Sequence, residues 1–335
     1  MRKYTDASQF SHVSVSGMPV PRVILGHLPF VGESYQGIMK NQEYCERFSH
    51  VENIVKILKK AVNEYGVTVF ANAPAVEGRP AILLDAIKYT IKATSVEMAL
   101  IPCFMIPLRI GDQPIDDYRR WITYYEIERK IAGKETNEKY VEDPILLCRK
   151  GWNERFSKAL TQLHPYDKEE IRKMRIDYGR LRDAAQSLEG LKVLFAELGS
   201  ETDFLAMMGR FDLLEEFSNT LKDYLGCPIL LATHHAGVTI PILDRSEVRF
   251  EGYLTPVNKL GAMMFPNQEL ALKEIMKTNK SVIAIKPLAG GRIPPKEALK
   301  YVYKEQRADA CMIGVGSEKE LDEDIQAAKS ALEEK

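Results

Sequence analysis

The chain has 335 residues, which exceeds an average domain and leaves room for one large domain with an insertion. Hydrophobic residues make up 45% of it and charged residues 28%, so the disordered and fibrous classes are excluded. The formal net charge of −1 argues against nucleic acid or an anionic membrane surface as a partner. We therefore expect a small-molecule ligand, and the oligomeric state stays open.

Cysteine usage and the N-terminal sequence bear on the compartment. The five cysteines are far apart, odd in number and form no C-x-x-C pair, which is typical of reduced thiols in the cytoplasm. Residues 1–10 are polar, and no run of about 18 uncharged apolar residues occurs anywhere. We expect a cytoplasmic protein without a membrane span.

Two elements near the N-terminus can be predicted from the sequence pattern. Residues 12–19 (HVSVSGMP) alternate in polarity around a Ser-Gly pair, which predicts a short hairpin closing the bottom of the fold. Further on, apolar residues between Val51 and Val62 recur at helical spacing and predict an amphipathic helix.

Seven or eight short apolar runs recur along the chain, most of them followed by a helical pattern. Near-continuous runs without strict alternation favour parallel strands that are buried on both faces. Their alternation with helices predicts an α/β fold, a (β/α)8 TIM barrel. The runs are residues 22–26, 67–71, 96–106, 202–208, 228–232, 252–257, 281–285 and 310–315.

The third and fourth runs are separated by more chain than a crossover helix needs. Residues 112–200 are interpreted as a helical insertion, with helical spacing at 116–131 and 168–188 and a possible short strand at 145–148. We expect one barrel domain over residues 1–335 that contains this insertion.

The sharpest local signal is a pair of glycine-rich segments, IAIKPLAGGR after strand seven and MIGVGSEKE after strand eight. Glycines allow backbone N–H groups to approach an anion, and a helix N-terminus adds free donors. The alternative is that the glycines only make tight turns while Ser317 and Glu320 cap a helix. The candidate phosphate or cofactor ligands are Gly290, Gly291, Arg292, Gly314, Gly316, Ser317 and Lys319.

Candidate catalytic residues lie at or near the ends of the predicted strands. His27 follows the first strand, and His234 and His235 follow the fifth, where at most one of the pair should face the barrel mouth. Lys286 ends strand seven in an apolar run, which is suited to anion binding or to a Schiff base. The H-x-H pair of barrel metallohydrolases is absent, so no metal is expected.

Several motifs in order resemble the aldo/keto reductase superfamily: SVSGMPVPRVILG, GVTVFANAP, ETDFLAMM, TPVNKLG, IAIKPLAGGR and MIGVGSEKELDED. The likeness covers residues 13–73 and 200–332. It implies a nicotinamide cofactor, usually NADPH, lying across the strand ends with its phosphates near residues 290–292 and 316–319.

The same resemblance implies a degenerate catalytic tetrad. The family's aspartate corresponds to Ala71, no tyrosine follows strand two, and Met208 stands where histidine is expected. Lys150 would supply the lysine only if residues 145–148 were the third strand. Reduction of generic aldehydes should therefore be very slow or absent.

Three functions stay open at this stage. One is a divergent NADP(H)-dependent oxidoreductase with His27 or Tyr35 as acid. Another is a lyase, aldolase or hydrolase that acts on a phosphorylated or carboxylated metabolite through His27, a histidine of the 234–235 pair and Lys286. The last is a non-catalytic ligand-binding barrel.

Overall fold

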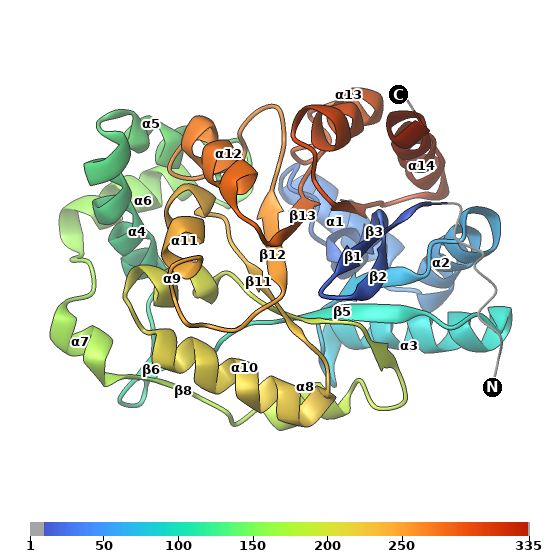
Figure 1. Cartoon of the computed structure of the whole chain (residues 1–335), viewed down its shortest axis with the longest axis horizontal. Coiled ribbons are helices and arrows are strands. Elements are labelled where there is room, and N and C mark those ends of the chain that lie inside the picture. Colours follow the sequence, from blue (N-terminus) through green and yellow to red (C-terminus); the bar gives the residue numbers. More distant parts are fainter. Residues whose placement is uncertain (1–9, 334–335) are drawn as a thin grey trace.

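The computed structural model describes residues 10–333 and contains the predicted closed barrel (Figure 1). Eight parallel strands pair around the ring, and the circle closes between β10 and β5. This confirms the (β/α)8 fold. In ring order the strands are β3 (Val23–Gly26), β4 (Val69–Asn72), β5 (Ala99–Phe104), β10 (Ala196–Leu198), β11 (Ile229–Ala232), β12 (Gly252–Pro256), β13 (Ser281–Ile285) and β14 (Ala310–Gly314).

The predicted N-terminal hairpin is present, with β1 (His12–Val15) paired antiparallel to β2 (Met18–Pro21). Ser16 and Gly17 take positive φ angles of 50° and 81° at the turn, which suits the twist of a tight hairpin. Val15 and Val20 are fully buried in one cluster with residues of the barrel interior, such as Ile24 and Val69. The hairpin therefore plugs the amino-terminal end of the barrel.

Amphipathic helices surround the barrel. The predicted helix at residues 51–62 is α2, whose buried residues Ile54, Leu58 and Ala61 lie on one face. Including α2, the helices outside the long β5–β10 connection are η1 (Leu28–Val31), α1 (Ile38–Arg47), α2 (Val51–Tyr65), α3 (Gly78–Thr94), α9 (Glu201–Met207), α10 (Phe211–Leu225), α11 (Ala236–Leu243), α12 (Gln268–Lys277), α13 (Pro295–Lys300), η3 (Tyr301–Glu305) and α14 (Glu318–Glu333). No helix in residues 10–333 is both long and apolar enough to cross a membrane.

One predicted strand is wrong. Residues 202–208 form the helix α9, and the fourth barrel strand is β10, just before it. Phe204, Leu205 and Ala206 are buried, and a short apolar run reads alike in a buried helix and a buried strand. As a result Met208 ends a helix, so it does not mark the end of a barrel strand.

The inserted segment, residues 105–195, connects β5 to β10. Besides helices it contains a small antiparallel sheet in the order β7-β6-β8, so it is less purely helical than predicted. Residues 145–148 form no strand, because η2 lies there. The elements are β6 (Leu108–Ile110), β7 (Gln113–Pro114), α4 (Asp117–Ala132), α5 (Glu135–Glu142), η2 (Leu146–Cys148), α6 (Trp152–Gln162), α7 (Lys168–Lys173), β8 (Met174–Ile176), α8 (Leu181–Gln186) and β9 (Lys192–Val193).

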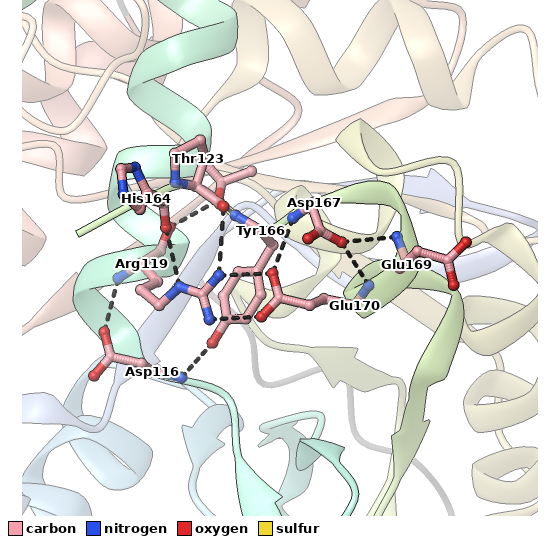
Figure 2. Close-up of polar contacts among 9 residues, drawn as sticks. Asp116, Arg119, Thr123, His164, Tyr166, Asp167, Glu169 and Glu170 are labelled. Atoms are coloured by element: carbon pink, nitrogen blue, oxygen red, sulfur yellow. Dashed lines mark hydrogen bonds and ion pairs between the residues drawn. The ribbon is translucent and has the colours of Figure 1, made fainter.

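A polar network holds α4 against the start of α7 (Figure 2). The Arg119 guanidinium donates to both carboxylate oxygens of Glu170 at 2.8 and 2.7 Å and to the His164 carbonyl at 3.0 Å. Asp167 and Glu170 form a capping box at the start of α7. These contacts fix the outer part of the inserted segment.

The inner part docks on the barrel through aromatic rings and one buried ion pair. Trp121 and Tyr140 of the inserted segment pack edge-on or tilted against Phe265, which follows β12. His235 Nδ1 lies 2.9 Å from Glu128 Oε1, and the Tyr140 hydroxyl donates to the other oxygen of Glu128. One buried cluster contains residues of both parts, so the inserted segment packs against the barrel.

Candidate functional site

A cavity of about 750 Å³ opens at the carboxyl ends of the barrel strands. The residues that line it come from the ends of β3, β5, β10, β11, β13 and β14, from the loops after these strands and after β4, and from the helices α1 and α14. All four predicted catalytic residues line this cavity: His27, Tyr35, His234 and Lys286.

The floor of the cavity holds an acid and a thiol. Glu197 of β10 and Cys103 of β5 are partners in the strand register, and the thiol is hydrogen-bonded to the carboxyl group. Each lies two residues beyond a side chain of the barrel interior, Phe195 and Ile101 respectively, so both face inward. Burial raises the pKa of Glu197 to about 7, against the opposing effects of Cys103 and Lys286. At neutral pH this carboxyl group can therefore both give and take a proton.

Lys286 supplies the positive charge of the floor. It adopts a φ of +54°, which is uncommon outside glycine, directly after β13. Its ammonium lies 4.8 Å from the centre of the Tyr35 ring, and within residues 10–333 it makes no hydrogen bond or ion pair. The ammonium is therefore available to an anionic or carbonyl oxygen of a ligand.

Two neutral histidines complete the floor. Burial, followed by the Lys286 charge, lowers the pKa of His27 to about 4 and that of His234 well below its usual value. His27 Nδ1 and His234 Nε2 are buried and have no hydrogen-bond partner among residues 10–333. The backbone of His234 is held by Asp203 of α9, which accepts its N–H at 2.8 Å. Both rings can exchange hydrogen bonds with a ligand without carrying charge.

His235 has a different role from its neighbour. It is buried against Glu128, which raises its pKa in spite of burial, and it lies outside the residues that line the cavity. Only one residue of the pair thus reaches the barrel mouth, as the strand geometry predicts.

The rim after β13 contains three predicted cofactor residues, Gly290, Gly291 and Arg292. The Arg292 guanidinium donates to the carbonyls of Tyr35 and Ala289, both at 2.8 Å, and to that of Pro144 at 2.9 Å. This side chain therefore ties the rim to the first loop and to the inserted segment.

The segment after β14 contains the other four. Gly314 lines the cavity, whereas Gly316, Ser317 and Lys319 lie outside its lining. Ser317 Oγ accepts the Glu320 N–H at 3.1 Å, so it caps α14, which is the alternative to a role in phosphate binding. Lys319 is exposed and lies 3.6 Å from Glu323.

Sequence reasoning missed Glu197, Cys103 and the acidic residues Glu320, Glu323 and Asp324, which also line the cavity. Misplacing strand four hid Glu197, because that strand was placed six residues too late. The signal that could have found it is the acid in the apolar run VLFAELG. Lys150 is exposed in the inserted segment and does not line the cavity.

Comparison with known proteins agrees with this architecture. No protein-family model and no curated protein matches the sequence. Among solved structures, a proposed aldo-keto reductase from Pseudomonas aeruginosa matches with a TM-score of 0.55 at 13% identity, covering 98% of this chain and 100% of its own. A Bombyx mori aldo-keto reductase in complex with NADP matches with a TM-score of 0.51 at 10% identity, covering 97% and 93%. The chain therefore has the fold of the aldo-keto reductases, as the sequence motifs indicate.

The residues after β14 do not fit the phosphates of a dinucleotide. The Gly316 N–H is taken by Glu320 Oε2 at 2.6 Å, and the Tyr44 ring fills the space beside Gly316. Three carboxyl side chains line this end of the cavity, and Arg292 is already bonded to carbonyls. The Gly316 N–H and the Arg292 guanidinium are therefore already bonded where a phosphate would need donors.

Proposed function

We propose that this chain is an enzyme that moves protons to or from a small carbonyl metabolite carrying an anionic group. The observation that carries the proposal is the convergence of Lys286, Glu197 and two neutral histidines on one cavity floor. A cation beside a carboxyl group of pKa about 7 is the arrangement that enolisation of a carbonyl compound requires.

The chemistry follows from these groups. The Glu197 carboxylate takes a proton from the carbon next to the substrate carbonyl, and the electron pair of the C–H bond moves onto the carbonyl oxygen. The Lys286 ammonium binds the anionic group next to the carbonyl and also stabilises the resulting enolate oxygen. His27 and His234 donate to or accept from the other substrate oxygens. Where the alpha carbon carries a hydroxyl group, a neutral histidine takes the proton of that hydroxyl and gives it to the former carbonyl oxygen, and return of the proton from Glu197 to the former carbonyl carbon completes an isomerisation.

Exchange in D2O tests the proposal. We expect the wild-type protein to exchange the C–H protons of α-ketobutyrate or hydroxyacetone faster than buffer, as followed by proton NMR. Glu197→Gln should slow this exchange by about 10²–10⁴-fold. Lys286→Met should also slow it, whereas Lys296→Met, an exposed lysine on α13, should not. Exchange at the buffer rate, or equal exchange in all variants, would overturn the proposal.

NADP(H)-dependent carbonyl reduction is the second candidate. It is favoured by the position of Gly290, Gly291, Arg292 and Gly314, which line the same cavity as Lys286. Equilibrium dialysis with NADPH and NADH separates the two candidates. Tight binding of NADPH that is lost on changing Arg292 would favour reduction, and absence of binding would leave the proton-transfer function.

A further inference from the structure

We use the word arm for the part of the cavity that is lined by residues of β14, α14 and α1. Its lining includes Met312 and Gly314 of β14, Tyr44 of α1, and the acidic residues Glu320, Glu323 and Asp324 of α14. The cationic side chains that line the cavity are Lys286 and Arg292, and neither belongs to these elements. The lining of the arm is therefore acidic, and the cationic side chains of the cavity come from other elements.

The start of α14 is already closed by the chain itself. Glu320 accepts the Gly316 N–H, and Arg47 donates to the Gly316 carbonyl. A side chain on Gly316 would collide with the Tyr44 ring, which leaves no room beside the backbone. The free N–H groups that would attract an anion are thus not presented to the arm.

Asp324 is the anomalous residue of the arm. It is 3% exposed and lies on the inner face of α14, with the apolar residues Leu321, Ile325 and Ala328. Within residues 10–333 its carboxyl group makes no hydrogen bond or ion pair, although it lines the cavity. Burying an unpaired carboxyl group is unfavourable unless a partner arrives.

We propose that this arm binds a cationic group of the ligand, an ammonium or guanidinium, through Asp324, Glu323 and Glu320. Together with Lys286 this defines the substrate class as a carbonyl compound with an anionic group at one end and a basic group at the other. The second statement rests on the proposed function, because Lys286 is assigned the anionic end. A ligand with a phosphate at the α14 end is disfavoured by the same charges.

Matched probes test the arm in the full chain. Isothermal titration calorimetry compares γ-aminobutyrate with butyrate and ε-aminocaproate with caproate, so that each pair differs only in a terminal amine. We expect at least one amine to bind roughly tenfold tighter than its plain acid, as a charge-assisted hydrogen bond would give. Asp324→Asn should reduce that ratio to near one. Glu333→Gln removes an exposed carboxyl group from the same helix and should leave the ratio unchanged.

The outcomes separate this inference from the proposed function. Plain acids that bind in a Lys286-dependent way, with no advantage for the amines, would overturn the cationic arm alone. Amines that bind through Asp324 without any contribution from Lys286 would overturn the proposed function alone. Absence of binding in both series at millimolar concentration overturns both. If Asp324→Asn does not fold, Glu323→Gln, at a half-exposed position, gives the same comparison.

Discussion

Buried ionisable groups occur in two regions of this molecule, with opposite bonding. At the junction between the inserted segment and the barrel, Glu128 accepts hydrogen bonds from Tyr140 and His235. In the cavity, Lys286 and Asp324 have no such partner within residues 10–333. A paired buried charge can hold two elements together, whereas an unpaired one is unfavourable until something binds it. The pairing in the first region therefore stabilises the fold, whereas the unpaired groups of the second region are available to a ligand.

The largest expected effect comes from breaking the junction. Glu128→Ala should lower the free energy of unfolding by about 3–5 kcal/mol, because it leaves His235 and Tyr140 buried without a partner. Urea denaturation followed by the fluorescence of Trp121 and Trp152, which pack in the same cluster, measures this change. Glu126→Ala on the same helix, whose partner Arg129 is half-exposed, should cost about 1 kcal/mol or less. If both variants lost the same free energy of unfolding, the buried pairs of Glu128 would not stabilise the junction more than an exposed pair does.

The barrel itself could be predicted from the sequence because most of its signals are local. The Ser-Gly turn of the hairpin and the apolar spacing of α2 each depend on a few neighbouring residues. The fourth strand could not, since α9 carries an apolar run of similar length and β10 has an acid in its interior. The pairing of β10 with β5 on one side and with β11 on the other distinguishes the two possibilities.

Some residues of the candidate site could likewise be predicted from the sequence, and others could not. His27, His234 and Lys286 are predictable because they end strands, and strand ends meet at one face of a barrel. Asp324 is not, because it stands among acids in EKELDED that read as a solvated helix face. Its burial depends on packing against the barrel, where Cys311 of β14 is one of its neighbours.

The next largest effect on the free energy of unfolding is expected in the cavity, at Asp324. Burial, with Glu320 and Glu323 nearby, raises the pKa of Asp324 to about 8 from a usual value of 3.8. Between these values the folded chain holds a proton that the unfolded chain has lost, so stability falls as pH rises and levels off above about 8. Asp324→Asn cannot ionise, so it should be increasingly more stable than the wild type across this window, by roughly 2–4 kcal/mol near pH 8.

Thermal unfolding at a series of pH values measures the Asp324 effect. The titratable groups that interact with Asp324 are Glu320 and Glu323 of α14 and Cys311 of β14, and the difference between the two proteins cancels their own contributions to first order. If the gain in stability of Asp324→Asn over the wild type decreased as the pH rises, Asp324 would not be an unpaired, buried carboxyl group.

A smaller effect is expected at the outer network of the inserted segment. The Arg119–Glu170 pair is bidentate but its side chains are 25% and 30% exposed, so Arg119→Ala should cost about 1 kcal/mol. The loss should diminish at high salt, because exposed ion pairs are screened. Arg172→Ala, which removes a more exposed pair with Glu169, should be close to neutral by the same denaturation measurement. A cost at Arg119 as large as that at Glu128 would mean that exposure does not separate the two pairs.

The smallest change in stability is expected at Lys286, where the change in ligand binding is largest. Lys286→Met removes no hydrogen bond or ion pair within residues 10–333 and loses only the contact with the Tyr35 ring, so the free energy of unfolding should change by about 0.5 kcal/mol or less. The substitution also removes a charge that lowers the pKa of His27, which should therefore rise from about 4 toward its usual value. An NMR titration of the His27 ring measures this rise in the same sample that is used for unfolding. A loss of several kcal/mol, with the His27 pKa unmoved, would show that Lys286 is paired inside the fold like Glu128 and is not held ready for a ligand.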